Sequence, residues 1–193
     1  EYFILEHGKM FDTIIDILAE KAAAGVDVRL IYDDVGCIQT LPPKFYLELQ
    51  KRGIHCACFN PFRPVLSIIL NNRDHRKITV IDGKVAYTGG FNLADEYINE
   101  KRKFGYWKDA GLRMTGAGVW SFTSMFLEMW DYITKTEDEY EFYRKASELP
   151  EDAVAGPGYI QPYSDSPLDH EDVGENVYLN LIEHAKKYVY IFT

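Results

Sequence analysis

Some segments of this chain have the apolar pattern of a β-strand, and others repeat apolar residues with the helical period of about 3.6 residues. These segments alternate, which predicts strands and helices in alternation. The pattern predicts a strand at Tyr2–Leu5, an amphipathic helix at Lys9–Ala24 and a nearly all-apolar strand at Val26–Tyr32. A second helix and strand are expected at Pro42–Arg52 and Ile54–Phe59. Strand, helix and strand in this order predict parallel strands with right-handed crossovers, in a sheet that helices cover on both faces.

The middle of the chain predicts a hairpin and a longer helix. Two apolar runs flank Asp82-Gly83, a dipeptide that favours hairpin turns. A longer helix is expected after the hairpin, and its aromatic stripe indicates core packing. The elements expected here are strands at Ile78–Ile81, Val85–Thr88 and Leu112–Met114 and a helix at Val119–Ile133. The proline-containing stretch Asn60–Leu70 is left unassigned.

Beyond residue 135 the chain changes character, which predicts a division into two parts. Residues 136–158 are acidic and rich in Pro and Gly, so they are expected to link residues 1–135 to residues 159–193. The elements expected after the linker are a strand at Tyr159–Tyr163, an acidic loop at Ser164–Gly174, a helix at Glu175–Lys186 and a strand at Tyr188–Phe192. This order echoes the start of the chain, so residues 159–193 are expected to begin a truncated second half, in a piece of a longer protein.

Composition narrows the classes of function. A formal net charge of −9 argues against a dedicated nucleic-acid binder, because such a protein needs a basic surface to neutralise phosphates. The basic run Lys101–Lys103 could touch a membrane surface or be a solvated loop. No apolar run is long enough to span a bilayer. Cys37, Cys56 and Cys58 lack the spacing of a disulfide framework, and Cys56 and Cys58 are expected to face a core from one side of a strand.

One short passage carries candidate chemistry, His75-Arg-Lys77-Ile-Thr-Val-Ile-Asp82. A neutral imidazole can attack phosphorus to form a covalent phosphohistidine, and an ammonium group can hold the phosphate oxygens as their charge builds. Side chains alternate in extended backbone, so His75 and Lys77 are expected to project from one face and serve one phosphate together. Asp82 has the opposite parity and is expected at the strand end or turn, from where it could support the site electrostatically.

A loop that comes after the passage adds candidate binding residues. Gly89 and Gly90 remove side-chain bulk where backbone must approach a ligand, and Asn92 brings a neutral donor to an anionic oxygen. On these residues alone an ordinary exposed hairpin stays an open interpretation.

The His-x-Lys-x4-Asp spacing followed by Gly-Gly-x-Asn resembles the signature of the phospholipase D superfamily. The wider stretch from Asn72 to Tyr97, with Trp107-Lys-Asp109 after it, is similar to the first catalytic half of bacterial cardiolipin synthases. The resemblance runs over most of the chain, although only the central residues carry chemistry. It implies an α/β fold with a phospholipase D-like mixed sheet flanked by helices on both faces.

The resemblance also implies a reaction. His75 would attack one phosphatidylglycerol and release glycerol, and a hydroxyl of a second phosphatidylglycerol would then take over the phosphatidyl group to give cardiolipin. Lys77 and Asn92 would steady the phosphorane charge, with electrostatic support from Asp82. No metal and no other cofactor is expected, because the Lys and Asn donors do the charge work of a cation.

The expected partners derive from the same resemblance. Two halves share one site in this superfamily, so this chain would hold half of a site and be inactive alone. Its partners would be phosphatidylglycerol, a membrane lipid surface and the missing second half, with no nucleic acid. The parent protein would be anchored in a bacterial cell membrane, with its catalytic part in the cytoplasm.

Three alternatives remain open at this point. Water in place of the second lipid would make the protein a phospholipase D, and the motif does not separate a hydrolase from a transferase. A nuclease of the superfamily would use the same residues on nucleic acid and would need a basic groove. A half that keeps the motif only as a non-catalytic scaffold would form no phosphohistidine.

Overall fold

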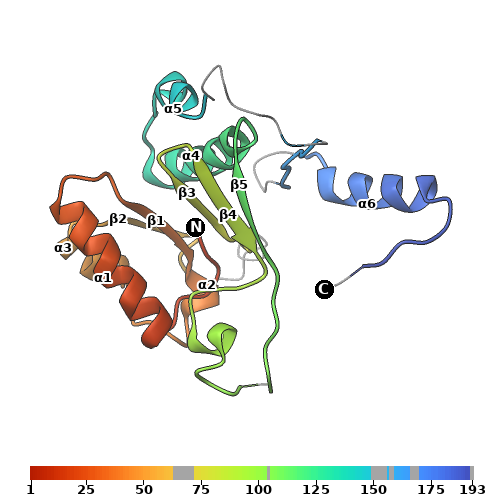
Figure 1. The fold of residues 1–193 in the computed structure, drawn as a ribbon. Coiled ribbons are helices and arrows are strands. Elements are labelled where there is room, and N and C mark those ends of the chain that lie inside the picture. The colour runs from red at the N-terminus through yellow and green to blue at the C-terminus, as the bar shows by residue number, and fades with distance from the viewer. Residues whose placement is uncertain (63–71, 104, 149–155, 157–158, 166–169, 192–193) are drawn as a thin grey trace. The chain divides into compact units, whose positions relative to one another are not determined.

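The structure is a computed structural model that describes residues 1–62, 72–103, 105–148, 156, 159–165 and 170–191 (Figure 1). Two compact units divide the chain, Glu1–Ala153 and Val154–Thr193. The first unit contains, in chain order, α1 (Lys9–Ala23), β1 (Arg29–Asp33), α2 (Asp34–Cys37), α3 (Tyr46–Lys51), β2 (His55–Phe59), β3 (Ile78–Ile81), β4 (Val85–Gly89), η2 (Asp95–Ile98), β5 (Gly111–Thr115), α4 (Val119–Thr134) and α5 (Tyr140–Ala146). The second unit contains α6 (Val173–His184).

Strands β1 and β2 form the parallel pair that the sequence predicts, with Arg29 opposite His55. Their side chains alternate between two buried clusters. One cluster lies under α1 and α3, and the other packs against Met129 and Trp130 of α4. Helices therefore cover both faces of this pair, and the expected α/β architecture is confirmed.

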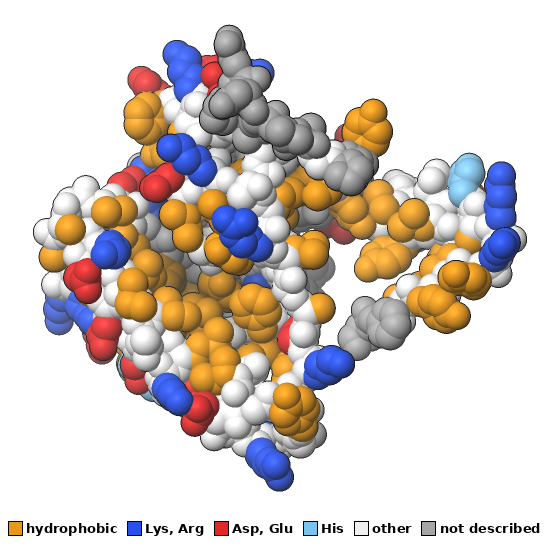
Figure 2. All heavy atoms as spheres, in the orientation of Figure 1, with side chains coloured by type: hydrophobic (Ala, Val, Ile, Leu, Met, Phe, Trp, Pro, Cys, Tyr) orange, Lys and Arg blue, Asp and Glu red, His pale blue; other side chains and the backbone are white. Residues whose placement is uncertain are grey.

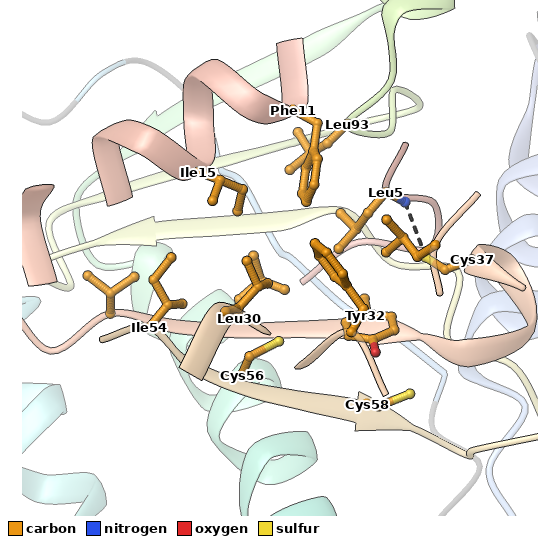
Figure 3. Close-up of a cluster of buried hydrophobic side chains, with 14 residues drawn as sticks. Leu5, Phe11, Ile15, Leu30, Tyr32, Cys37, Ile54, Cys56, Cys58 and Leu93 are labelled. Carbon is orange, nitrogen blue, oxygen red and sulfur yellow. Dashed lines mark hydrogen bonds between the residues drawn. The ribbon is translucent and has the colours of Figure 1, made fainter. Parts of the chain in front are cut away.

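The larger cluster fills the space between α1 and the parallel strands (Figure 3). Phe11 and Ile15 of α1 meet Leu30 and Tyr32 of β1 there. Cys56 and Cys58 also belong to this cluster and are buried, so the predicted inward orientation of the two thiols is confirmed.

Strands β3, β4 and β5 form a separate antiparallel sheet in that order. The turn between β3 and β4 has positive φ angles at Asp82 (54°) and Gly83 (64°), and the Lys84 N–H donates to the Ile81 carbonyl oxygen at 3.0 Å. Glycine and aspartate tolerate this left-handed backbone. The predicted hairpin is confirmed.

The first residues of the chain lie between the two sheets. Tyr2 N donates to Ile31 O at 3.1 Å, and Ile78 N donates to Glu1 O at 2.9 Å. The strand expected at Tyr2–Leu5 is reduced to two isolated bridges, one at each end. The amide groups of Ile4 and Leu5 explain why, because they donate to side chains instead of a neighbouring strand.

Several boundaries differ from the sequence prediction. The expected helix at Pro42–Arg52 is shortened to α3, since Lys44 adopts φ of 62°, which an α-helix cannot contain. The strand expected from Val26 begins at Arg29. The unassigned stretch Asn60–Leu70 lies mostly outside the described residues.

Helix α5 lies in the segment that the sequence pattern predicts to be a linker. Side chains of this segment contact the rest of the first unit. Arg29 Nη1 donates to Asp138 Oδ2 at 2.6 Å, and Arg29 Nη2 donates to the Tyr143 hydroxyl at 3.0 Å. The guanidinium also lies 5.4 Å from the ring centroid of Trp130 in α4, within range of a cation–π interaction. One arginine of β1 thus connects α4 and α5 to the parallel strands.

The second unit departs from the sequence prediction in its strands. Helix α6 overlaps the expected helix at Glu175–Lys186, but Tyr159–Tyr163 and the described part of Tyr188–Phe192 are not strands. A strand needs a neighbour that takes its backbone donors and acceptors, and the described residues of this unit offer none. Phe192 and residues 166–169 of the expected acidic loop lie outside the described residues. Over the described part of the whole chain, no helix is both long and apolar enough to cross a bilayer.

Candidate active site around His75 and Lys77

A completely buried carboxylate at the end of β1 holds the backbone in front of His75. Asp33 accepts hydrogen bonds from Asp74 N at 3.0 Å, Gly36 N at 2.9 Å and Arg73 Nη1 at 3.2 Å. Burial raises the pKa of Asp33, while these three donors act in the opposite direction. The position at the carboxyl end of a parallel strand is where α/β sheets place their sites.

His75 and Lys77 share one neighbour, the phenyl ring of Phe3. The imidazole centroid lies 4.6 Å from the Phe3 centroid, and Lys77 Nζ lies 5.6 Å from it. Lys77 Nζ also donates to the His75 carbonyl oxygen at 2.6 Å. The imidazole is exposed, whereas Lys77 is buried. An accessible ring beside a sheltered ammonium group is an arrangement that can receive one phosphate.

Burial lowers the pKa of both the His75 imidazole and the Lys77 ammonium group. Desolvation and the positive charge of Lys77 lower the pKa of His75, which favours the neutral imidazole, the form that can act as a nucleophile. Desolvation lowers the pKa of Lys77 to about 8, against the opposing charges of Asp74 and Asp109. An anionic phosphate beside Lys77 would favour its charged form.

Asn92 is buried beside the segment that carries Phe3, and two of the four hydrogen-bonding positions of its amide are used. Its Oδ1 accepts from Ile4 N at 3.0 Å, and its Nδ2 donates to the Tyr97 hydroxyl at 2.8 Å. An amide nitrogen carries two hydrogens, and the bond to Tyr97 uses one of them. The same side chain therefore also fixes the segment that carries Phe3.

The structure gives the two loop glycines a reason that differs from the expected one. A Cβ at Gly89 would lie 2.6 Å from Ala110 O, and a Cβ at Gly90 would lie 2.5 Å from Asp109 Oδ1. The approach that requires glycine is thus made by the protein's own residues just before β5. Gly89 leaves room for Ala110, and Gly90 leaves room for Asp109.

Asp82 is not brought to the other motif residues. It is exposed in the β3–β4 turn, where the neighbouring Gly83 packs against α5. Strand β3 separates it from Lys77 by five residues, a rise of about 16 Å. The position at the turn agrees with the sequence prediction, but electrostatic support from this distance through solvent is weak.

Asp109 is a site residue that the motif itself does not contain. Its charge acts on Lys77, and its Oδ2 accepts from Trp107 Nε1 at 3.0 Å. The signal in the sequence was Trp107-Lys-Asp109, which belongs to the wider resemblance and had no assigned role. No group of three or more His, Cys, Asp or Glu side chains suited to a metal ion occurs among the described residues.

Comparisons with known proteins identify close relatives. A protein of Streptococcus mutans without an assigned function is 50% identical over the whole chain, which covers 41% of that protein. Cardiolipin synthases of Staphylococcus aureus and Alkalihalophilus pseudofirmus are each 35% identical over 99% of the chain, which covers 38% and 37% of them. The chain thus spans about two fifths of the length of the relatives it matches.

The family comparison covers the candidate site except for Asp109. Residues 2–105 match the family described as "Cardiolipin synthase, PLD-like domain", a range that includes Phe3, His75, Lys77 and Asn92. A phospholipase D family member, Nuc from Salmonella typhimurium, is a more distant structural neighbour, with 14% identity and a TM-score of 0.43 over 67% of this chain and 75% of that one. The match to more than half of the chain shows that it belongs to the cardiolipin synthase family of phospholipase D-like domains.

Proposed function

We propose that this chain is the first catalytic half of a phosphatidyltransferase that joins two phosphatidylglycerol molecules into cardiolipin. The observation that carries the proposal is the pairing of an exposed imidazole, His75, with a buried ammonium group, Lys77, on one phenyl ring. The imidazole is the nucleophile, and the ammonium group holds phosphate oxygens. The names of the relatives supply the product, cardiolipin, and the resemblance of the motif region implies phosphatidylglycerol as the substrate.

The reaction proceeds in two displacements at phosphorus. A nitrogen of neutral His75 attacks the phosphodiester, the bond from phosphorus to the glycerol headgroup breaks, and the departing alkoxide takes a proton from a histidine of the other half. The primary hydroxyl of a second phosphatidylglycerol then attacks, losing its proton to that same histidine. The phosphorus–nitrogen bond breaks, cardiolipin forms and neutral His75 returns.

Lys77, Asn92 and Asp109 complete the proposed half-site around His75. Lys77 and the remaining Asn92 donor stabilise the oxygens of the pentacoordinate phosphorus. Asp109 keeps Lys77 more easily charged than burial alone would allow. Asp82 stabilises the hairpin turn in this proposal, and its expected electrostatic contribution to the site is minor.

The proposed partners derive from the size of the relatives and the nature of the substrate. The relatives have more than half their length outside the range that this chain matches, and we place the second catalytic half there. The lipid substrate requires contact with a membrane surface, and we assign the full-length protein to the bacterial cell membrane with this half on the cytoplasmic side. No metal or other cofactor takes part in the proposed steps.

Product analysis in the full-length protein tests this function. With phosphatidylglycerol labelled in the phosphatidyl group, we expect labelled cardiolipin and free glycerol. His75→Ala should lower the rate at least about 10⁴-fold, because no other group in the motif can form the covalent intermediate. His55→Ala is the matched control, since His55 is an exposed histidine at the start of β2, and it should keep normal activity. Phosphatidic acid as the sole product would contradict the transferase and identify a hydrolase.

A further inference from the structure

Phe3 touches both side chains that the proposed chemistry uses. Its ring lies 4.6 Å from the His75 ring, with an interplanar angle of 57°, and 5.6 Å from Lys77 Nζ. Such a tilted arrangement is a favourable geometry between aromatic rings. A ring beneath an ammonium group attracts it through the ring quadrupole and occupies space that water would fill.

Several independent contacts hold Phe3 in place. The flanking amide groups of Ile4 and Leu5 donate to Asn92 Oδ1 at 3.0 Å and to Cys37 Sγ at 3.2 Å. Behind the segment, a Cβ at Gly36 would lie 2.1 Å from Phe3 O and 2.9 Å from the ring. Phe3 therefore rests directly on α2, the short helix whose first turn Asp33 caps.

The Asp33 carboxylate also holds the backbone on the His75 side of the contact. Asp33 accepts from Gly36 N, which lies under Phe3, and from Asp74 N, which precedes His75. One buried group thus fixes the backbone beneath the phenyl ring and the backbone that carries the imidazole. The fold therefore holds in place the two backbone segments that carry the Phe3 and His75 rings.

We infer that Phe3 is a positioning residue, whose ring fixes the orientation of the His75 imidazole and keeps water away from the Lys77 ammonium group. Its catalytic consequence rests on the proposed function, whereas its contacts do not. A nucleophile held in a reactive orientation gains rate because little freedom is lost in the transition state, and misplacement by about 1 Å can cost 10²-fold. A dry ammonium group also interacts more strongly with a phosphate than a hydrated one.

Kinetics of Phe3→Leu in the full-length protein provide the first test. We expect kcat to fall about 10- to 100-fold, with KM changed less than about threefold, because the ring orients the reacting groups and does not bind the lipid. Phe3→Tyr keeps the ring and should restore kcat to within about threefold of the unsubstituted protein. Phe11→Leu is the matched control, since Phe11 lies in the neighbouring core cluster. It should lower thermal stability and leave kcat unchanged.

Nuclear magnetic resonance of the 193-residue chain provides a second test that needs no activity. In Phe3→Leu the ring-proton signals of His75 should shift, because the neighbouring ring current is lost. The pKa of Lys77 should rise from about 8, because its burial is the largest cause of that low value. Phe11→Leu should change neither.

The outcomes separate the inference from the proposed function. Unchanged His75 signals and an unchanged kcat in a folded Phe3→Leu protein would overturn the role of Phe3. Shifted signals in the chain, together with a full-length protein that transfers no phosphatidyl group, would overturn the proposed function and leave the positioning contact standing. Equal losses of kcat in Phe3→Leu and Phe11→Leu would show a general packing effect and also overturn the inference.

Discussion

At the scale of single residues, His75 and Lys77 have opposite exposure although they are two positions apart. The backbone before β3 turns the imidazole outward, while Lys77 folds back to the His75 carbonyl and the Phe3 ring. A nucleophile must reach its substrate, whereas a charge that stabilises phosphate is stronger away from water. This difference in exposure, more than the spacing of the motif, makes the pair suitable for phosphoryl chemistry.

The low pKa of Lys77 predicts a titration that can be measured directly. We expect its Nζ to titrate at about pH 8, against an ordinary value of 10.5, because burial opposes the charged form. Between these two values the unfolded chain binds the proton more tightly, so this group makes the free energy of unfolding rise with pH in that window. Carbon-13 titration of lysine side chains checks this, with Lys77→Gln to assign the signal. A Lys77 value above 10 would contradict the buried geometry.

The separation of Asp82 from the site predicts a contrast between two substitutions. Lys77→Gln should lower kcat by about 10²–10³-fold, as for loss of one donor to a developing charge. Asp82→Asn should keep activity within about twofold, since asparagine also tolerates left-handed backbone in a turn. Steady-state kinetics of the two full-length variants measure this. Comparable losses in both would mean that Asp82 acts at the site after all.

At the scale of elements, contacts between near neighbours in the chain were predictable and distant ones were not. The hairpin follows from Asp82-Gly83 between apolar runs, and the β1–β2 pair follows from the alternation of helical and strand periods. Helix α5 was missed because the arginine that secures its segment lies 109 positions before Asp138. Neither composition nor periodicity reports such a partner.

At the candidate site, too, contacts between residues far apart in the chain could not be predicted. The motif indicated His75, Lys77 and Asn92, and the structure brings them around one segment. The contact of Phe3 with His75 could not be predicted, because the two residues belong to distant parts of the chain that only the fold brings together. The strands expected in the second unit are absent because a local strand pattern needs a partner strand, and the described residues of that unit contain none.

The arginine of β1 predicts a specific loss of stability. Arg29→Ala should lower the free energy of unfolding by about 1–3 kcal/mol, because Asp138 would lose its charged partner and the Tyr143 hydroxyl one of its hydrogen bonds in a mostly buried place. Denaturant unfolding of the 193-residue chain measures this. Arg52→Ala is the matched control, because its ion pair with Asp16 is exposed, and it should change stability by less than about 0.5 kcal/mol. Equal effects would contradict the connecting role of Arg29.

At the scale of the whole molecule, the described residues of the first unit form a packed core but, in the proposed function, an incomplete site. These described residues include a parallel strand pair with a buried cluster and helices on each face, and an antiparallel sheet. The side chains on the surface in Figure 2 mix hydrophobic, basic and acidic types. The proposed reaction needs a second histidine to protonate the leaving alcohol, and the other four histidines of the chain carry no matching motif. We therefore expect this chain to fold on its own but to be inactive on its own.

The incomplete site predicts the behaviour of the chain in isolation. The purified 193-residue chain should unfold cooperatively but make no cardiolipin from phosphatidylglycerol when it is monomeric. Addition of the remaining part of the full-length protein, expressed separately, should restore transfer. Thin-layer analysis of labelled lipid measures both. Robust synthesis by the monomeric chain alone would show that one half contains the whole site.

The covalent intermediate tests the central claim most directly. The full-length protein is mixed with phosphatidylglycerol labelled at phosphorus, quenched in alkali within one turnover, digested and mapped by mass spectrometry. We expect the label on a nitrogen of His75, absent in His75→Ala and retained in His55→Ala. Transfer at the normal rate with no label on His75 would contradict the assignment of this residue as the nucleophile.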